Sequence, residues 1–303
     1  LGLEPRVRHV VGDVRDGAAL SAALHEAAPE FVFHLAAQAL VRRAYADPVA
    51  TFATNVLGTV NVLEAARGCP SVRSLVCITS DKCYENVEWP WGYRENDALG
   101  GHDPYSASKA AAELAFSAYR RSYLAADAKL GAATTRAGNV IGGGDWSPDR
   151  IVPDCVRAAS TGAPIRLRHP GATRPWQHVL EPVSGYVLLG AALAASPAAA
   201  SGAWNFGPST QQVRTVREIA CGIAAALGRG SAIEVEPAAD GRHEALLLQL
   251  NCDKAHQLLG WYPRWPVDRT IDATASWYRR VLDGESAADV TRAQVREYFP
   301  ELA

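Results

Sequence analysis

Residues 74–82 read SLVCITSDK, a run of branched apolar residues that ends in a hydroxyl, a carboxylate and an ammonium group. The apolar part, residues 75–79, predicts a buried β-strand. Similar runs predict strands over residues 7–11, 31–36 and 133–137, and alanine-rich stretches with helical spacing lie between them at residues 16–28, 48–67 and 106–126. Strands that alternate with such helices form a parallel sheet covered on both faces. We therefore expect an α/β fold with a doubly wound parallel sheet.

The sequence changes character after Asn139. A glycine-rich loop, GGGDWSPDR, precedes predicted helices over residues 152–160, 179–195, 216–227 and 268–282 and short predicted strands at 204–206 and 233–235. We interpret this part as a smaller α/β region that packs directly on the first, with a ligand-binding cleft between them. The predicted division assigns 1–145 and about 175–195 to the first domain, and 146–174 and 196–303 to the second.

The composition excludes several classes of protein. A net charge of −2 over 303 residues gives no electrostatic footprint for nucleic acid or an anionic membrane. No apolar run is long enough to span a membrane and no signal-peptide core opens the sequence, so we predict a cytoplasmic location. The six cysteines form no C-x-x-C pair and the histidines have no metal-ligand spacing, so we expect no metal site.

Tyr105 and Lys109 form a Y-x-x-x-K pair at the start of a predicted helix. This spacing places both side chains on one helix face, one turn apart. An ammonium group beside a phenol stabilises the phenolate and lowers its pKa, so the tyrosine becomes a usable base. The pair alone is common in helices, but Ser80, Asp81 and Lys82 follow the strand at 75–79, at the sheet edge where α/β proteins bind ligands.

Five separated segments carry a family resemblance: TSDKCYEN, WGYREND, GGHDPYSASKAAAEL, RAGNVIGGGDW and RPWQHVLEP. With FHLAAQ and TNVLGTVNVLEAA before them, they resemble extended short-chain dehydrogenases/reductases that act on nucleotide sugars. More narrowly, they resemble the CDP-glucose 4,6-dehydratases. The resemblance implies a Rossmann-type NAD-binding domain and a smaller nucleotide-sugar-binding domain.

The resemblance also implies an NAD-dependent lyase that oxidises C4 of CDP-glucose, eliminates water across C5 and C6 and returns hydride to C6. The product is CDP-4-keto-6-deoxyglucose. Tyr105 would be the base for the C4 hydroxyl, Lys109 would lower its pKa and Ser80 would hydrogen-bond the C4 oxygen. Asp81, with a raised pKa, would protonate the leaving C6 hydroxyl. Lys82 stands where dTDP-glucose dehydratases carry glutamate, so it would take the C5 proton when neutral or stabilise the enolate when charged.

The same resemblance implies two sets of binding residues. Those for NAD are Asp13, Val14, Leu35, Ala36, Ala37, Gln38, Asn55, Tyr105 and Lys109. Those for the sugar nucleotide are Asn139, Arg174, His243 and Glu244, of which the arginine offers a guanidinium fork to the diphosphate. A homodimer or larger homo-oligomer is implied, paired through helices at residues 54–66 and 106–123.

The sequence begins at Leu1, contains no methionine and has no strand followed by G-x-x-G-x-x-G. We therefore expect a first βαβ unit to be missing, and these 303 residues alone to be unstable and inactive although the complete gene product is active. Two other functions remain open: another nucleotide-sugar reaction of the superfamily, such as 4-epimerisation or decarboxylation, and an inactive sugar-nucleotide-binding fragment.

Overall fold

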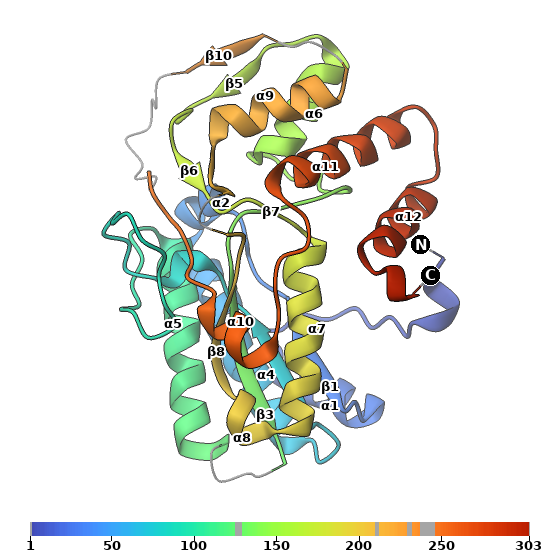
Figure 1. The fold of residues 1–303 in the computed structure, drawn as a ribbon. Coiled ribbons are helices and arrows are strands. Elements are labelled where there is room, and N and C mark those ends of the chain that lie inside the picture. The colour runs from blue at the N-terminus through green and yellow to red at the C-terminus, as the bar shows by residue number, and fades with distance from the viewer. Residues whose placement is uncertain (1, 125–128, 210–211, 229–231, 237–245, 303) are drawn as a thin grey trace.

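A computed structural model describes residues 2–124, 129–209, 212–228, 232–236 and 246–302. Its centre is a four-stranded parallel sheet in the order β1-β2-β3-β8 (Figure 1). The strands are β1 Phe31–His34, β2 Ser74–Ile78, β3 Gly131–Ala137 and β8 Gly202–Phe206. The predicted strands at 31–36, 75–79 and 133–137 are therefore confirmed, and so is the parallel α/β fold.

Helices cover both faces of this sheet because the side chains of a strand alternate between its faces. Leu75 and Cys77 of β2 pack in one apolar cluster with α1 Gly17–Ala27, α4 Gly58–Gly68 and α5 Pro104–Tyr119. Val76, between them, belongs to a second cluster with α7 Leu180–Ala195 and α10 Asp253–Leu259. Figure 1 shows α5 and α7 flanking the sheet.

The second region lies beyond the carboxyl ends of the strands (Figure 1). Its apolar core contains Trp176, Ile219 and Trp277 and joins α6 Ile151–Thr161, α9 Val216–Ala226 and α11 Val267–Leu282. The remaining short elements are α2 Val41–Ala46, α3 Pro48–Phe52, α8 Pro197–Ala200, α12 Ala287–Tyr298, β4 Val140–Ile141, β5 Ile165–Leu167, β6 Thr173–Arg174, β7 Gln177–His178, β9 Arg214–Thr215 and β10 Ile233–Val235. Every helix predicted from spacing is present, apart from the end of the 106–126 stretch, which lies outside the described residues.

Two strand predictions are corrected by the structure. Residues 7–11 form no strand: Val7 and Val11 are 56% and 88% exposed. An extended segment gains ladder hydrogen bonds only beside another strand, and β1 pairs only with β2 among the described residues. The strand predicted at 204–206 exists, but it pairs with β3 in the main sheet and not in the second region.

No helix in the described ranges is long and apolar enough to cross a membrane. Five of the six cysteines are buried free thiols, as expected for small apolar residues, and Cys221 is exposed. Among the same described residues, no group of three histidine, cysteine or acidic side chains is arranged to hold a metal ion.

Candidate active site

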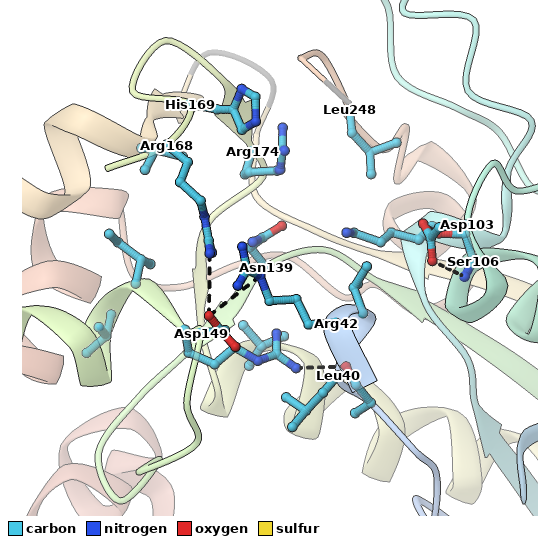
Figure 2. A pocket seen from close by; sticks show the side chains of 18 of the residues that line it. Leu40, Arg42, Asp103, Ser106, Asn139, Asp149, Arg168, His169, Arg174 and Leu248 are labelled. Atoms are coloured by element: carbon cyan, nitrogen blue, oxygen red, sulfur yellow. Dashed lines mark hydrogen bonds and ion pairs between the residues drawn. The ribbon is translucent and has the colours of Figure 1, made fainter. Parts of the chain in front are cut away.

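A cleft of about 610 Å³ opens where the sheet faces the second region (Figure 2). Segments that follow β1, β2 and β3 line one part of it, and residues of α6, β5 and β6 line another. This position, at the carboxyl ends of parallel strands, is where open α/β sheets bind ligands. The predicted cleft is thus present and is large enough for a small organic ligand.

The turn after β2 carries the first catalytic candidates. Ser80 has an extended backbone and caps a short 3₁₀ helix, Asp81–Cys83, by accepting a hydrogen bond from Lys82 N at 3.2 Å. Its hydroxyl donates to Asp81 Oδ1 at 3.0 Å. Lys82 lies on the cleft wall. The turn therefore places a hydroxyl and a carboxyl side by side, next to the cleft-lining Lys82, although neither Ser80 nor Asp81 lines the cleft itself.

Asp81 is a buried carboxyl with one oxygen left unsatisfied. Its side chain is 3% exposed, and Oδ2 has no hydrogen-bond partner among the described residues. Burial raises the pKa of Asp81, while Lys82, the Ser80 hydroxyl and Arg174 oppose that rise. The direction agrees with the prediction, because an acid that donates near neutral pH needs a raised pKa.

An N-terminal cap fixes where α5 begins. Asp103 Oδ1 accepts from the backbone N–H groups of Tyr105 at 2.9 Å and Ser106 at 3.0 Å, and Pro104 occupies the first helical turn. Aspartate and then proline are the residues that a helix start favours. Tyr105 and Lys109 consequently share a buried face of the first turns of α5. Asp103 was missed by the sequence reasoning, although an aspartate followed by a proline is typical of a helix start.

The structure corrects the expected effect of Lys109 on Tyr105. Burial raises the pKa of the Tyr105 phenol to about 12, while a hydrogen bond with Ser80 works against this rise. The Lys109 ammonium donates to Ile78 O at 3.2 Å, at the end of β2. Burial also lowers the pKa of Lys109 to about 8. Helical spacing predicted the shared face correctly. The Lys109 ammonium, however, bonds to Ile78 O, and it is not among the main groups that shift the pKa of Tyr105.

The segment after β1 is tied to α5 by Asn55. Asn55 Oδ1 accepts from Gln38 N at 2.8 Å, and its Nδ2 donates to Gln38 O at 3.0 Å and Ser108 Oγ at 2.9 Å. Ser108 lies next to Lys109 in the sequence. The predicted cofactor segment Leu35, Ala36, Ala37 and Gln38 is therefore held beside α5.

Asp13 and Val14 lie away from the cleft lining. Asp13 is on the surface, where its bonds to Arg15 lower its pKa to about 2. Val14 O accepts from Asn61 Nδ2 at 2.8 Å, and a Cβ on Gly58 would approach Val14 to 2.7 Å, so only glycine fits there. The structure thus docks this loop on α4.

Two of the four predicted sugar-nucleotide residues line the cleft, namely Asn139 and Arg174. Arg174 is 3% exposed, and its Nη1 donates to Thr173 O at 2.8 Å. His243 and Glu244 lie outside the described residues.

Arg42, Asp149 and Arg150, which line the cleft, were also missed. Asp149 lies 3.7 Å from the Arg42 guanidinium and 3.4 Å from that of Arg168 (Figure 2). Arg150 donates to Ala39 O at 3.1 Å, and its charge works to lower the pKa of Tyr105. These contacts join the segment after β1 to the second region. Sequence patterns carry no signal for ion pairs between such distant segments.

The comparisons with known proteins agree with this geometry. A model of the family described as GDP-mannose 4,6 dehydratase matches residues 2–274. The chain belongs to this family. It is 42% identical to a CDP-glucose 4,6-dehydratase of Salmonella typhimurium over 95% of this chain and 81% of that protein. Its family is enzymatic and its sugar-nucleotide 4,6-dehydratases depend on NAD.

Solved structures of related enzymes share the fold. A dTDP-glucose 4,6-dehydratase from Streptomyces venezuelae, solved with NAD and TYD bound, matches with a TM-score of 0.80 and 26% identity, over 93% of this chain and 83% of that one. A UDP-glucose 4-epimerase from Thermus thermophilus, solved with NAD, matches with a TM-score of 0.76 and 29% identity, over 88% of this chain and 83% of that one.

Proposed function

We propose that this family member converts CDP-glucose to CDP-4-keto-6-deoxyglucose. The observation that carries the proposal is the buried Asp81 carboxyl with its unsatisfied Oδ2, held by Ser80. A 4-epimerase needs a base at C4 but no acid for a leaving hydroxyl. A carboxyl whose pKa is raised by burial is the kind of acid that an elimination requires. The 42% identity to a CDP-glucose enzyme supports the choice of nucleotide.

The residues of the site divide the reaction between them. The Tyr105 phenol, hydrogen-bonded with Ser80, takes the proton of the C4 hydroxyl once it is ionised. Asp81 gives its proton to the C6 hydroxyl as that group leaves. Lys82, on the cleft wall, removes the proton from C5 or stabilises the enolate in this proposal. Arg174, buried and cationic at the cleft, holds the diphosphate.

The described residues fit the nicotinamide ribose end of NAD. Residues 35–38 leave the carboxyl end of β1 with exposed side chains at Leu35 and Ala36 and half-buried ones at Ala37 and Gln38. The Lys109 ammonium lies at the end of the neighbouring β2 and holds the ribose hydroxyls in this proposal. When bound, NAD would accept a hydride from C4 and supply it to C6. Asp13 and Val14 would face the adenine.

Substrate profiling tests the proposal. The protein with added NAD is incubated with CDP-glucose, dTDP-glucose or UDP-glucose, and the 4-keto-6-deoxy product is followed by its absorbance in alkali. We expect product from CDP-glucose well before the other two. UDP-galactose formed from UDP-glucose would identify a 4-epimerase, and binding of sugar nucleotide without turnover would identify an inactive binding protein. Either result would overturn the proposal.

We further propose that two copies pair in the cytoplasm through an apolar face on α3 and the turn after it. Val49, Phe52 and Leu57 are 79%, 38% and 58% exposed there and line an apolar groove. Such a surface is typical of an interface. Light scattering should give a dimer for the native protein and a monomer for Val49→Asp; a monomeric native protein would contradict this.

A further inference from the structure

Glu113 is the third member of a stripe along α5. Tyr105, Lys109 and Glu113 follow one another at intervals of four residues, so their side chains emerge from one helix face. Glu113 is only 2% exposed and Lys109 only 6%. A charge carried so far into the interior is costly unless it is paired and hydrogen-bonded. The mechanism above uses the first two residues and leaves the third without a role.

Both oxygens of the Glu113 carboxylate accept hydrogen bonds from two neighbouring strand segments, the end of β2 and the body of β3. Oε1 accepts from Thr79 Oγ1 at 2.5 Å, directly after β2. Oε2 accepts from Thr134 Oγ1 at 2.8 Å and from Arg136 Nη2 at 2.7 Å, both on β3. These bonds clamp α5 to the sheet. Thr79 immediately precedes Ser80, so the clamp also holds the base of the catalytic turn.

Arg136 extends the clamp to the chain after Asp81. It is 3% exposed, and its Nη1 donates to Tyr84 Oη at 2.8 Å and to Glu95 O at 3.0 Å. Burial works to lower the pKa of Arg136, but the Glu113 carboxylate raises it overall, so the guanidinium stays charged. The catalytic turn is therefore held on both sides by one buried ion pair.

We propose that Glu113, paired with Arg136, is a positioning residue that fixes Lys109 and the Ser80–Asp81 turn relative to each other and keeps a negative charge beside the lysine. Lys109 donates to Ile78 O, and Glu113 accepts from the next residue, Thr79. Lys109 and Glu113 thus form hydrogen bonds with adjacent residues at the end of β2. The catalytic consequence rests on the proposed function, whereas the coupling between Glu113 and Lys109 does not.

Other titratable groups that face Lys109 are neutral near pH 7. Cys77 on β2 has a pKa raised to about 12 by burial, and burial also raises the pKa of Cys83 on the turn well above its usual value. His34 on β1 has a pKa lowered to about 4, by burial and by Lys109 itself. Burial lowers the pKa of Lys109, and Glu113 opposes this shift. Glu113 is therefore the group that keeps the ammonium charged.

Direct titration of the lysines tests this coupling. The sequence contains only four lysines, so lysine labelled with ¹³C at Cε gives four resolvable side-chain signals, and Lys109→Arg identifies the one sought. Glu113→Gln alone would leave a buried unpaired guanidinium, so the test variant is the double substitution Glu113→Gln/Arg136→Met, which removes both charges. We expect the Lys109 midpoint to fall by at least about one pH unit.

A matched control uses the other carboxylate near Arg136. Glu95→Gln should leave the Lys109 midpoint unchanged and lower that of Lys254, since Glu95 acts on the pKa of Lys254. A folded double variant whose Lys109 midpoint equals that of the native protein would overturn the proposal. This result is independent of turnover, so a native protein that makes no product from CDP-glucose refutes the proposed function and leaves the titration valid.

Glu113→Asp separates position from charge and covers the case in which the double variant does not fold. The shorter side chain keeps the negative charge, so the Lys109 midpoint should stay near its native value. Loss of the bond geometry should slow C4 oxidation about tenfold or more at every pH, because small misplacements at a reacting centre are costly. A native oxidation rate in this variant would refute the positioning role.

Discussion

Replacement of Asp81 by asparagine should slow elimination strongly while it spares oxidation at C4. Asparagine has nearly the same shape, and its Oδ1 can keep the hydrogen bond that Ser80 donates to Asp81 Oδ1 at 3.0 Å. The amide nitrogen then stands at the position of Oδ2, which has no hydrogen-bond partner among the described residues. The site should therefore keep its geometry and lose only the acidic proton.

The expected size of the loss follows from that single missing function. General acid catalysis by a positioned side chain contributes about 10²–10⁴-fold, which corresponds to roughly 3–5 kcal/mol of activation free energy. Oxidation at C4 depends on Tyr105 and Lys109 and should fall less than about tenfold, within the range of a small change in orientation. Reduced nicotinamide should consequently accumulate in the variant during a single turnover.

Stopped-flow absorbance of the nicotinamide and chemical quench of the keto product separate the two steps. Asp81→Asn should show rapid formation of reduced nicotinamide followed by slow product. Equal losses in both steps would refute the assignment of Asp81 as the acid. Ser80→Ala offers a matched comparison, because removal of the hydroxyl that contacts both Tyr105 and Asp81 should slow both steps.

The same substitution should change stability in a direction fixed by the raised pKa. A carboxyl whose pKa is higher in the folded than in the unfolded protein stabilises the fold below its unfolded pKa, and this contribution is lost as pH rises through the folded value. The asparagine that replaces Asp81 would carry no charge at any pH. Urea unfolding should therefore show that Asp81→Asn is more stable than the native protein on the alkaline side, and the difference should shrink as pH falls.

Three further substitutions probe separate parts of the site. Tyr105→Phe should slow C4 oxidation about 10²–10⁴-fold with little change in the affinity for CDP-glucose measured by calorimetry; an unchanged oxidation rate would contradict its role as base. Asp103→Ala removes the cap of α5 and should cost about 1 kcal/mol of stability in urea unfolding, with Asp103→Asn close to native. Arg174→Lys keeps the charge but loses the guanidinium fork, so the Kd for CDP should rise more than that for cytidine; equal changes would show that the arginine does not hold the diphosphate.

Local sequence patterns predicted those parts of the fold that local physics decides. Branched apolar runs with polar ends became β1, β2 and β3, and the alanine-rich helical spacing became α5. Residues 7–11 have the same strand pattern, but a strand needs a neighbour for its hydrogen bonds, and that condition is not local. The placement of Gly202–Phe206 beside β3 likewise depends on a pairing between segments far apart in the chain.

In the candidate site too, local patterns predicted some features, and contacts between distant segments decided the others. Spacing alone placed Tyr105 and Lys109 on one helix face, and strand polarity placed Ser80 and Asp81 near them. Spacing could not show that the Lys109 ammonium reaches Ile78 O, because that contact depends on how deeply α5 sits on the sheet. The expected fall in the pKa of Tyr105 is wrong, because the structure buries the phenol and burial raises its pKa more than the neighbouring groups lower it.

Each buried charge of this site would lower the stability of the fold if it stood alone. Burial disfavours the charged form of both Asp81 and Lys109, which suits the proposed acid role of Asp81 and makes the charge of Lys109 depend on Glu113. The Glu113–Arg136 pair is equally buried, yet it is fully hydrogen-bonded at the carboxylate and joins α5 to both central strands. Because a paired charge resists displacement that would unpair it, this ion pair can hold α5 and the Ser80–Asp81 turn at fixed positions relative to each other.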